Sequence, residues 1–189
     1  MGLTVLQLLP ALDVGGVERG TVEIAAALTA AGHRALVMSA GGRLVAELEK
    51  VGAEHVTCPI GAKRLSTLRL VKKVADVIDS SQVDIVHARS RLPAWIGRIA
   101  IRRLPEARRP HWVTTVHGPY TVNRYSRVMT SGDRVIAISQ FIVDYLNHHY
   151  PDVEDERIRL IHRGIDPGYF QHGYQPSEHW RAQWTRDFP

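Results

Sequence analysis

Residues 8–20 read LLPALDVGGVERG, a stretch in which an apolar run meets two adjacent glycines. The apolar run is interrupted by Pro10 and becomes more polar at Asp13. Gly15 and Gly16 then come shortly before a charged pair. Such a pattern is typical of the turn between a first strand and a first helix. Glycines at that turn also let backbone N–H groups approach a phosphate or a sugar closely. A plain tight turn and a ligand-binding loop are both open interpretations at this point.

Outward from this turn, strand-like and helix-like segments alternate along the chain. The predicted strands cover 3–9, 35–39, 54–58, 83–87, 112–117, 134–139 and 157–162, and the predicted helices cover 17–31, 44–51, 65–79, 93–103 and 140–148. Gly32 and Gly52 are placed to end the first two helices. Because right-handed crossovers put helices on both faces of a parallel sheet, the alternation predicts a Rossmann-like doubly wound α/β domain. Ligands bind such sheets at the carboxyl ends of the strands.

Composition fits a globular protein of one domain. The chain has 189 residues, 44% of them hydrophobic, and a single cysteine, Cys58, which excludes an intramolecular disulfide. No apolar run approaches the roughly 18 residues that span a bilayer, and the N-terminus lacks the basic start of a secretory signal. These features predict a cytoplasmic protein whose contact with a membrane, if it has one, is peripheral.

The net charge of +5 is concentrated in residues 89–109. This segment holds seven arginines against one acid, Glu106. A phosphorylated substrate, an anionic lipid surface and a nucleic acid would all be attracted to it, and a solvated helix face is the alternative. The sequence contains no recognised nucleic-acid-binding module and no basic face rich in aromatic residues, so a nucleic-acid partner is disfavoured.

The loop after the fourth predicted strand carries hydrogen-bond donors. Arg89, Ser90 and Arg91 come one residue after His87 and precede a helix, a position suited to phosphate or hydroxyl groups. His87 itself fits a ligand-facing role or a satisfied histidine at a strand end. We therefore predict that these three residues after His87 bind substrate.

The loop after the fifth predicted strand contains the sharpest candidate for chemistry. His117 stands at the carboxyl end of a central strand, where an imidazole can hydrogen-bond a reacting hydroxyl. Gly118, Tyr120 and Asn123 follow in a polar loop that shapes an acceptor site or merely connects two elements. After the sixth strand, Ser139 is a substrate-binding candidate whose favoured role is the N-cap of the next helix.

Several catalytic classes are disfavoured by missing motifs. The chain has no G-x-G-x-x-G fingerprint, no P-loop, no G-x-S-x-G elbow and no H-E-x-x-H or Cys/His zinc spacing. A nicotinamide or flavin enzyme and a metal-dependent hydrolase therefore have no support, and no metal site is predicted.

Five motifs in order resemble the N-terminal half of a family 4 glycosyltransferase of the two-domain GT-B type. They read LLPALDVGGVERGTVEIAAALTAAGH, DIVHARSRLPAW, TTVHGPY, DRVIAIS and RLIHRGID, and the match that they mark covers essentially residues 3–170. The resemblance implies two Rossmann-like domains facing each other across a cleft. The N-terminal domain would bind the acceptor and the C-terminal one a nucleotide-sugar donor, with sugar transfer that retains anomeric configuration and needs no metal.

The resemblance also implies roles for individual residues. Gly15 and Gly16, with Val17 and Glu18 beside them, would form a glycine loop facing the cleft, where backbone amides meet phosphate or sugar oxygens. His117 would contact the transferred sugar. The segment from Arg163 to Asp166 matches the family's N-G-[VI]-D, so both of these residues are predicted to bind substrate. The chain departs from the pattern with arginine at 163 and histidine at 162, which weakens the case for a donor contact from Arg163.

The family's C-terminal domain carries a glutamate pair that this sequence lacks. We therefore expect residues 1–166 to be the acceptor-side domain and 167–189 a linker and the start of a missing nucleotide-sugar-binding domain. Because half a cleft stabilises only half of the leaving group's charge, the chain alone should transfer sugar poorly. The leading function is sugar transfer to a cell-envelope or lipid-linked saccharide, such as lipopolysaccharide, at an anionic membrane surface. The alternative is a stand-alone binding module for a phosphorylated sugar or nucleotide.

Overall fold

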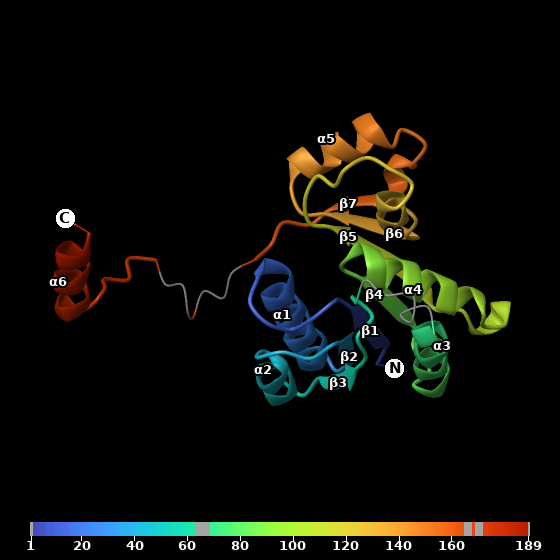
Figure 1. Ribbon diagram of the computed structural model, residues 1–189, viewed down its shortest axis with the longest axis horizontal. Coiled ribbons are helices and arrows are strands. Elements are labelled where there is room, and N and C mark those ends of the chain that lie inside the picture. The colour runs from blue at the N-terminus through green and yellow to red at the C-terminus, as the bar shows by residue number, and fades with distance from the viewer. Residues whose placement is uncertain (1, 63–68, 165–167, 169–171, 189) are drawn as a thin grey trace.

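A seven-stranded parallel sheet forms the centre of the protein (Figure 1). The computed structural model describes residues 2–62, 69–164, 168 and 172–188. The strands are β1 (Thr4–Leu8), β2 (Arg34–Ser39), β3 (Glu54–Thr57), β4 (Ile85–Ala88), β5 (His111–Val116), β6 (Arg134–Ala137) and β7 (Ile158–Leu160). The helices are α1 (Gly16–Ala30), α2 (Val45–Lys50), α3 (Leu70–Ser80), α4 (Arg91–Arg102), α5 (Gln140–His149) and α6 (Glu178–Asp187), with short 3-10 turns η2 (Glu106–Arg108), η3 (Ser126–Thr130) and η4 (Asp155–Arg157).

The strand order β3-β2-β1-β4-β5-β6-β7 confirms the predicted doubly wound α/β class. The chain winds outward from β1 to β3, returns across the sheet to β4, and then winds outward in the other direction. The order therefore reverses between β1 and β4, and the loops that follow these two strands diverge there, which opens a crevice at their carboxyl ends. The predicted helix over 65–79 falls partly outside the described residues, and every other predicted boundary lies within two residues of the observed one.

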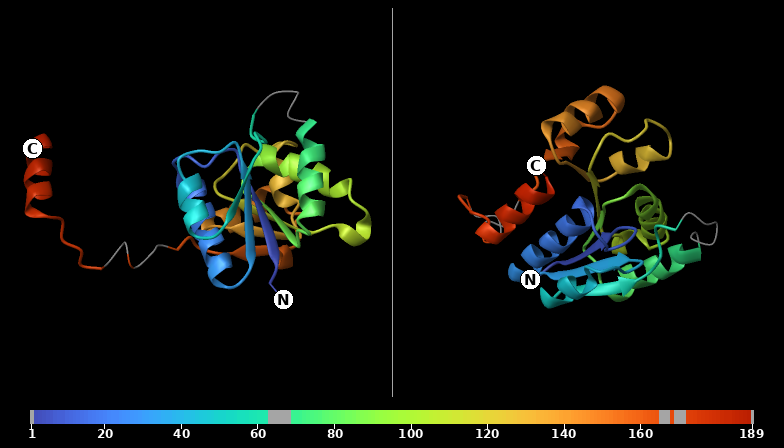
Figure 2. Two further views of the ribbon diagram at one scale, coloured as in Figure 1. Left: turned by 90° about the horizontal axis from the view of Figure 1, so that it is seen from below. Right: turned by 60° about the vertical axis from the view of Figure 1, so that its left-hand side comes forward.

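Helices cover the two faces of the sheet unequally. Figure 2 shows α1 and α2 on one face and α3 and α4 on the other. The larger hydrophobic core lies between the sheet and α3, α4 and α5, where Leu6, Val86 and Ile96 are fully buried. The smaller core lies under α1 and α2, around Leu9, Val37 and Leu48. On the α1 side, helices therefore cover the sheet mainly over β1, β2 and β3.

Strand register decides which side chains face α1. Gln7 of β1 pairs with His87 of β4, and Thr115 of β5 pairs with Ile136 of β6. Side chains alternate between the faces of a sheet, so residues in these positions point to the same side as α1. A cavity of about 460 Å³ lies over this part of the sheet and is lined by Ile24 of α1 together with His87, Thr115 and Ile136.

Glycines end the first two helices as predicted. Gly32 and Gly52 follow α1 and α2 with φ of 78° and 79°, a left-handed conformation that residues with a side chain seldom adopt. The amide of Gly32 donates to the carbonyl of Thr29, which satisfies a group left open by the last helical turn.

The C-terminal segment from 172 to 188 lies apart from the sheet (Figures 1 and 2). It contains α6, none of whose residues is buried. The rings of Trp180 and Trp184 stack on each other with centroids 5.1 Å apart, and both side chains are about half exposed. The segment predicted as a linker thus includes a helix. In the part of the chain that the structure describes, no helix is long and apolar enough to cross a membrane.

Candidate functional site

Two cavities meet at the carboxyl ends of β1, β4 and β5, and Arg89 and His117 line both of them. We call the first the loop cavity; it measures about 350 Å³. It is lined by Pro10, Val17, Glu18, Arg89, Ser90, His117, Gly118, Pro119 and Tyr120. Seven of these nine residues were predicted to bind substrate or react, so the fold brings together loops that are distant in the sequence.

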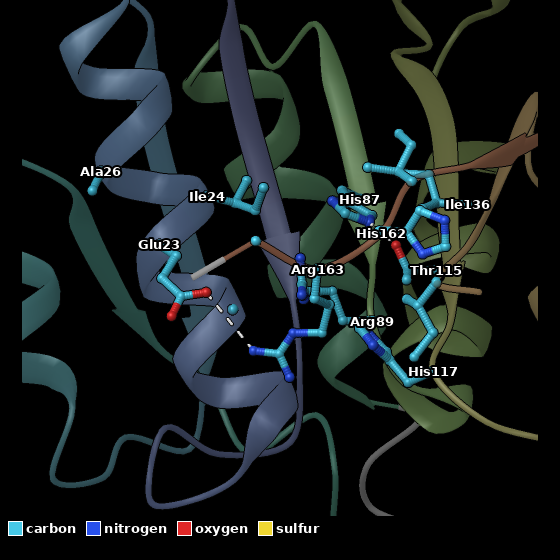
Figure 3. A pocket seen from close by; sticks show the side chains of 14 residues that line it. Glu23, Ile24, Ala26, His87, Arg89, Thr115, His117, Ile136, His162 and Arg163 are labelled. Atoms are coloured by element: carbon cyan, nitrogen blue, oxygen red, sulfur yellow. Dashed lines mark hydrogen bonds and ion pairs between the residues drawn. The ribbon is translucent and has the colours of Figure 1, made fainter. Parts of the chain in front are cut away.

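The second cavity, which we call the sheet cavity, is the space over β4 to β6 beside α1 (Figure 3). Its floor is largely apolar, with Ile136 and Ile138 exposed toward it, and Glu23 and Arg163 stand at its α1 side. In Figure 3 the segment after β7 crosses toward α1 and carries Arg163 to the cavity's edge. Arg89 and His117 therefore form a polar wall that the two cavities share.

Arg89 is a buried cation. Its side chain is 5% exposed, its Nη1 donates to Gln7 Oε1 at 3.2 Å, and its buried Nε has no partner among the described residues. Burial, together with the positive charge of Arg163, lowers the pKa of Arg89 to about 10. Within the basic segment 89–109, Arg89 therefore faces the interior, because its strand end points the guanidinium into the domain.

The second glycine of the pair makes room for Arg163. A Cβ built on Gly16 would lie 2.5 Å from Arg163 Nη1, and one on Gly20 would lie 3.2 Å from the Nη2 atoms of both Arg163 and Arg89. Arg163 also lies 3.7 Å from the carboxylate of Glu23. The absence of side chains along this stripe of α1 thus lets two guanidinium groups approach the first turns of the helix.

Gly15 is the N-cap of α1, and its backbone is extended rather than left-handed. The Glu18 carboxylate lies against it, where an added Cβ would collide with Oε2. A negative charge is stabilised at this end of a helix, because the first backbone N–H groups have no partner within the helix. The Glu18 carboxylate therefore lies at the start of α1 against Gly15, and the Arg163 guanidinium lies beside the next residue, Gly16.

His117 follows β5 directly and is half-buried. Its Nε2 is buried and has no hydrogen-bond partner among the described residues. Burial is the main cause, and the charges of Arg89 and Arg163 are further causes, of a pKa lowered to about 3. At neutral pH the ring is therefore uncharged, with one nitrogen free to bond a hydroxyl group.

His87 lies behind His117 with its bonding satisfied. His87 Nε2 and Thr115 Oγ1 are 2.6 Å apart and share a hydrogen bond, and the His87 side chain is 7% exposed. Burial, followed by the charges of Arg89 and His117, lowers the pKa of His87 to about 3. Of its two open interpretations, the structure favours a satisfied histidine at a strand end that borders the sheet cavity.

Comparison with known proteins identifies the family. The sequence profile described as Glycosyltransferase Family 4 matches residues 14–169, well over half of the chain. The chain belongs to glycosyltransferase family 4. A search of curated protein sequences returned no match.

Solved structures show the same fold. A glycosyltransferase from Rickettsia africae ESF-5 is similar over 100% of this chain and 50% of its own, with 34% identity and a TM-score of 0.80. Anabaena Alr3699/HepE, solved with UDP and glucose, is 21% identical over 98% of this chain and 50% of its own, with a TM-score of 0.72. WaaG, a glycosyltransferase involved in lipopolysaccharide biosynthesis, is 14% identical over 97% and 51%, with a TM-score of 0.67. The chain thus spans about half the length of these family 4 or similarly folded proteins.

Arg91 and Asn123, which were predicted to bind substrate, make contacts with nearby residues of the domain. The Arg91 guanidinium lies over the rings of Tyr120 and Tyr125, 4.8 and 5.4 Å from their centroids, and donates to Ser126 Oγ. Asn123 Oδ1 accepts a 2.8 Å hydrogen bond from the Ser126 amide and so orders the start of η3.

Ser139 is the N-cap of α5, as its favoured interpretation held. Its Oγ accepts from the Ile142 amide at 3.4 Å. Ser139, Arg91 and Asn123 line neither the loop cavity nor the sheet cavity. Asp166 lies outside the described residues.

The site also includes residues that sequence reasoning missed. Gln7 bridges two elements, since it accepts from Arg89 and its Nε2 donates to the Thr21 carbonyl of α1 at 3.0 Å. Its signal was a lone amide within the apolar strand LTVLQLL. Gly20 and Glu23 gave no such signal, because their proximity to Arg163 depends on the path of the chain after β7.

The arrangement offers a definite set of chemical groups. It supplies two guanidiniums, the start of a 15-residue helix and a neutral imidazole around two cavities that share Arg89 and His117. Among residues 2–62, 69–164, 168 and 172–188, no three His, Cys, Asp or Glu side chains form a group that could hold a metal ion.

Proposed function

We propose that this domain is the acceptor-side half of a retaining glycosyltransferase, which moves a sugar from a nucleotide-sugar donor to a saccharide acceptor without a metal ion. The observation that carries the proposal is the position of His117. Its unpartnered Nε2 lies in the wall between the loop cavity and the sheet cavity, next to Arg89 and close to the glycine loop. Membership of the family and the UDP-glucose bound in the structure of Anabaena HepE support a nucleotide-sugar as donor.

Charge on the departing diphosphate must be stabilised as the glycosidic bond breaks. Donors that are already oriented toward the place where charge develops serve this purpose best. The start of α1 at Gly15 and Gly16, with Arg163 above it, provides such donors on this side of the cleft. We propose that Val17, Glu18 and Ser90 border the same bound substrate in the loop cavity.

Neutral His117 fits a role as hydrogen-bond partner of the sugar. Since its pKa lies at about 3, the imidazole carries no charge at pH 7 and does not act as a cation there. A neutral ring has one donor and one acceptor nitrogen, so it can hold a sugar hydroxyl in the orientation that transfer requires. Gly118 and Tyr120 would shape the acceptor side of this contact.

The acceptor that we propose is a cell-envelope or lipid-linked saccharide. WaaG acts in lipopolysaccharide biosynthesis, and the basic segment of this chain would favour an anionic lipid surface. Arg102 and Arg103 are exposed and have no ion-pair partner among the described residues, whereas Arg108 pairs with Asp79 at 2.7 Å. The enzyme would therefore work in the cytoplasm at the inner face of the membrane.

A turnover assay tests this proposal. The native gene is sequenced beyond the codon for Pro189, and the full-length product and the 189-residue chain are each given a panel of nucleotide-sugars with lipid-linked acceptors. We expect transfer with retained anomeric configuration, unaffected by a chelator, from the longer protein and very little from the 189-residue chain.

Three results would contradict parts of the proposal. Robust turnover by the 189-residue chain would contradict its dependence on a second domain. Inverted products would contradict the stereochemistry. Saturable binding of a nucleotide-sugar by the full-length protein, with no transfer to any acceptor, would favour the stand-alone binding module instead.

A further inference from the structure

A third cavity, which we call the arginine cavity, lies away from the candidate site and shares no lining residue with it. It measures about 320 Å³ and lies between α4, η3 and the segment that precedes β7. Four arginines line it together with Trp95 and Asp152: Arg98, Arg124, Arg127 and Arg157.

The charges in this cavity do not balance. Arg127 pairs with Asp152, whereas Arg98 and Arg124 have no hydrogen-bond or ion-pair partner among the described residues. The four arginines and the one aspartate of the cavity therefore carry an excess of three positive charges. Arg98 and Arg157 are half-buried, and burial, with the charges of Arg102 and Arg157, lowers the pKa of Arg98. Arg124 and Arg127 are exposed, so the half-buried Arg98 and Arg157 are the cations of this cavity that are partly shielded from water.

Backbone carbonyl groups hold one of the four arginines in place. Arg157 Nε donates to the Gly132 carbonyl at 3.0 Å, and its Nη2 donates to the carbonyls of Gly132 and Thr130. These contacts fix the plane of the guanidinium, and its Nη1 makes no hydrogen bond to a described residue. An ordered guanidinium loses little conformational entropy when it binds an anion.

We infer that the arginine cavity binds a phosphate group. Guanidiniums bind phosphate through paired, charge-assisted hydrogen bonds, and a phosphate monoester carries about −1.5 to −2 charge at neutral pH, nearer to the excess here than a single carboxylate. The volume admits the group that bears the phosphate as well. The inference does not depend on sugar transfer, because none of these residues lines the candidate site.

Side-chain NMR of the ¹⁵N-labelled chain tests this with inorganic phosphate. The Nε–Hε signals of Arg98 and Arg157 should shift saturably, and Arg98→Gln with Arg124→Gln should weaken phosphate binding at this cavity at least about tenfold, the size of one lost charge-assisted bond. Arg43→Gln, an exposed cation near the other edge of the sheet, should leave these shifts unchanged. Thermal unfolding of each variant shows that it is folded.

Two results would overturn the inference. One is a shift confined to Arg89 and Arg163, which would assign phosphate to the candidate site alone; the other is unchanged affinity in the double variant. The source of the phosphate is then distinguished with phosphatidylcholine vesicles that contain phosphatidic acid. If they compete with inorganic phosphate for the arginine cavity, the ligand is a lipid headgroup, and if they do not, it is a soluble phosphate ester.

Discussion

Some residues of this candidate site are placed to contact a ligand, whereas others position a neighbouring residue. His117 has a free buried nitrogen, whereas His87 is satisfied by Thr115. Gly16, which has no side chain, leaves the space that the Arg163 guanidinium occupies. Each of these differences can be tested by a separate measurement.

Replacing His117 with alanine should reduce kcat of the full-length enzyme about a hundredfold, a typical loss for one positioned polar group in a reacting site. Stability should change little, because the Nε2 of this side chain has no partner among the described residues. The measurement is kcat and KM together with the unfolding midpoint. His148→Ala, on the exposed surface of α5, is the matched control. Full activity in His117→Ala would remove this residue from the mechanism.

Gly16→Ala should displace the Arg163 guanidinium, because the new Cβ would lie 2.5 Å from Nη1 and the end of a long side chain moves easily. We expect weaker binding of the nucleotide-sugar, by about tenfold or more if a charge-assisted bond is lost. Titration calorimetry in the full-length enzyme measures this. In an Arg163→Ala background the same glycine change should have no further effect. An equal loss in both backgrounds would show that the ligand contacts Gly16 directly.

The buried histidines should make the domain sensitive to acid. The pKa of His87 is about 3 in the fold and near 6.5 unfolded, so the unfolded chain binds a proton between these values and the native one does not. Stability is therefore complete above pH 6.5 and falls as pH drops, by about 1.4 kcal/mol per pH unit for this group. Urea unfolding at pH 7, 5 and 4 should show a shallower loss in His87→Asn than in the unaltered chain. An identical pH slope would contradict the prediction.

At the scale of elements, helix starts distinguish structural from substrate-facing serines. Ser139 and Ser90 are both N-caps with extended backbones, at α5 and α4. The Ser139 side chain accepts a hydrogen bond from its own helix, whereas the Ser90 side chain makes no capping hydrogen bond and Ser90 lines the loop cavity. The two positions form a natural pair for comparison.

Ser139→Ala should lower the free energy of unfolding by about 1 kcal/mol, the usual value of a lost side-chain cap, and leave KM unchanged. Ser90→Ala should do the reverse, with little loss of stability and a raised KM for the substrate in the loop cavity. Denaturant unfolding and steady-state kinetics of the full-length enzyme measure both. A raised KM in Ser139→Ala with unchanged stability would restore Ser139 as a binding residue.

At the scale of the whole molecule, helices cover the two faces of the sheet unequally, and this determines where a cavity stays open. One face is packed against α3, α4 and α5, and the other is packed only beside β1 to β3, which leaves the sheet cavity open next to α1. Exposed cations lie at the end of α4, separate from this opening. We therefore expect the molecule to meet a membrane and a donor through different surfaces.

Removing Arg102 and Arg103 should weaken binding to anionic vesicles at least about tenfold at low salt, because each basic residue near such a surface contributes on the order of 1 kcal/mol. Sedimentation with vesicles containing phosphatidylserine measures it. The control removes Arg43 and Lys50, which lowers the net charge equally near the opposite edge of the sheet. Equal effects of the two double variants would show a response to net charge alone and contradict a membrane-facing segment.

Much of the fold was predictable, because its signals are local. Apolar strands, helical spacing and Gly32 and Gly52 as helix ends are set by residues within a few positions of each other. The candidate site was predictable in part, since the carboxyl ends of parallel strands must meet at one edge. The three residues that this rule placed there, His117, Arg89 and Ser90, all line the loop cavity. Arg91 follows Arg89 by two residues but lines neither cavity, and its guanidinium lies over the rings of Tyr120 and Tyr125.

The sequence alone determined the α/β class, the strand and helix ends, the family resemblance and the loops in which the site lies. Only the tertiary structure decided that Arg89 is buried, that Arg163 fills the space above Gly16 and Gly20, and that four arginines enclose a separate cavity. The reason is that periodicity and turn chemistry act over a few residues. Burial, charge proximity and the shape of a cavity arise only when segments that are distant in the sequence pack together.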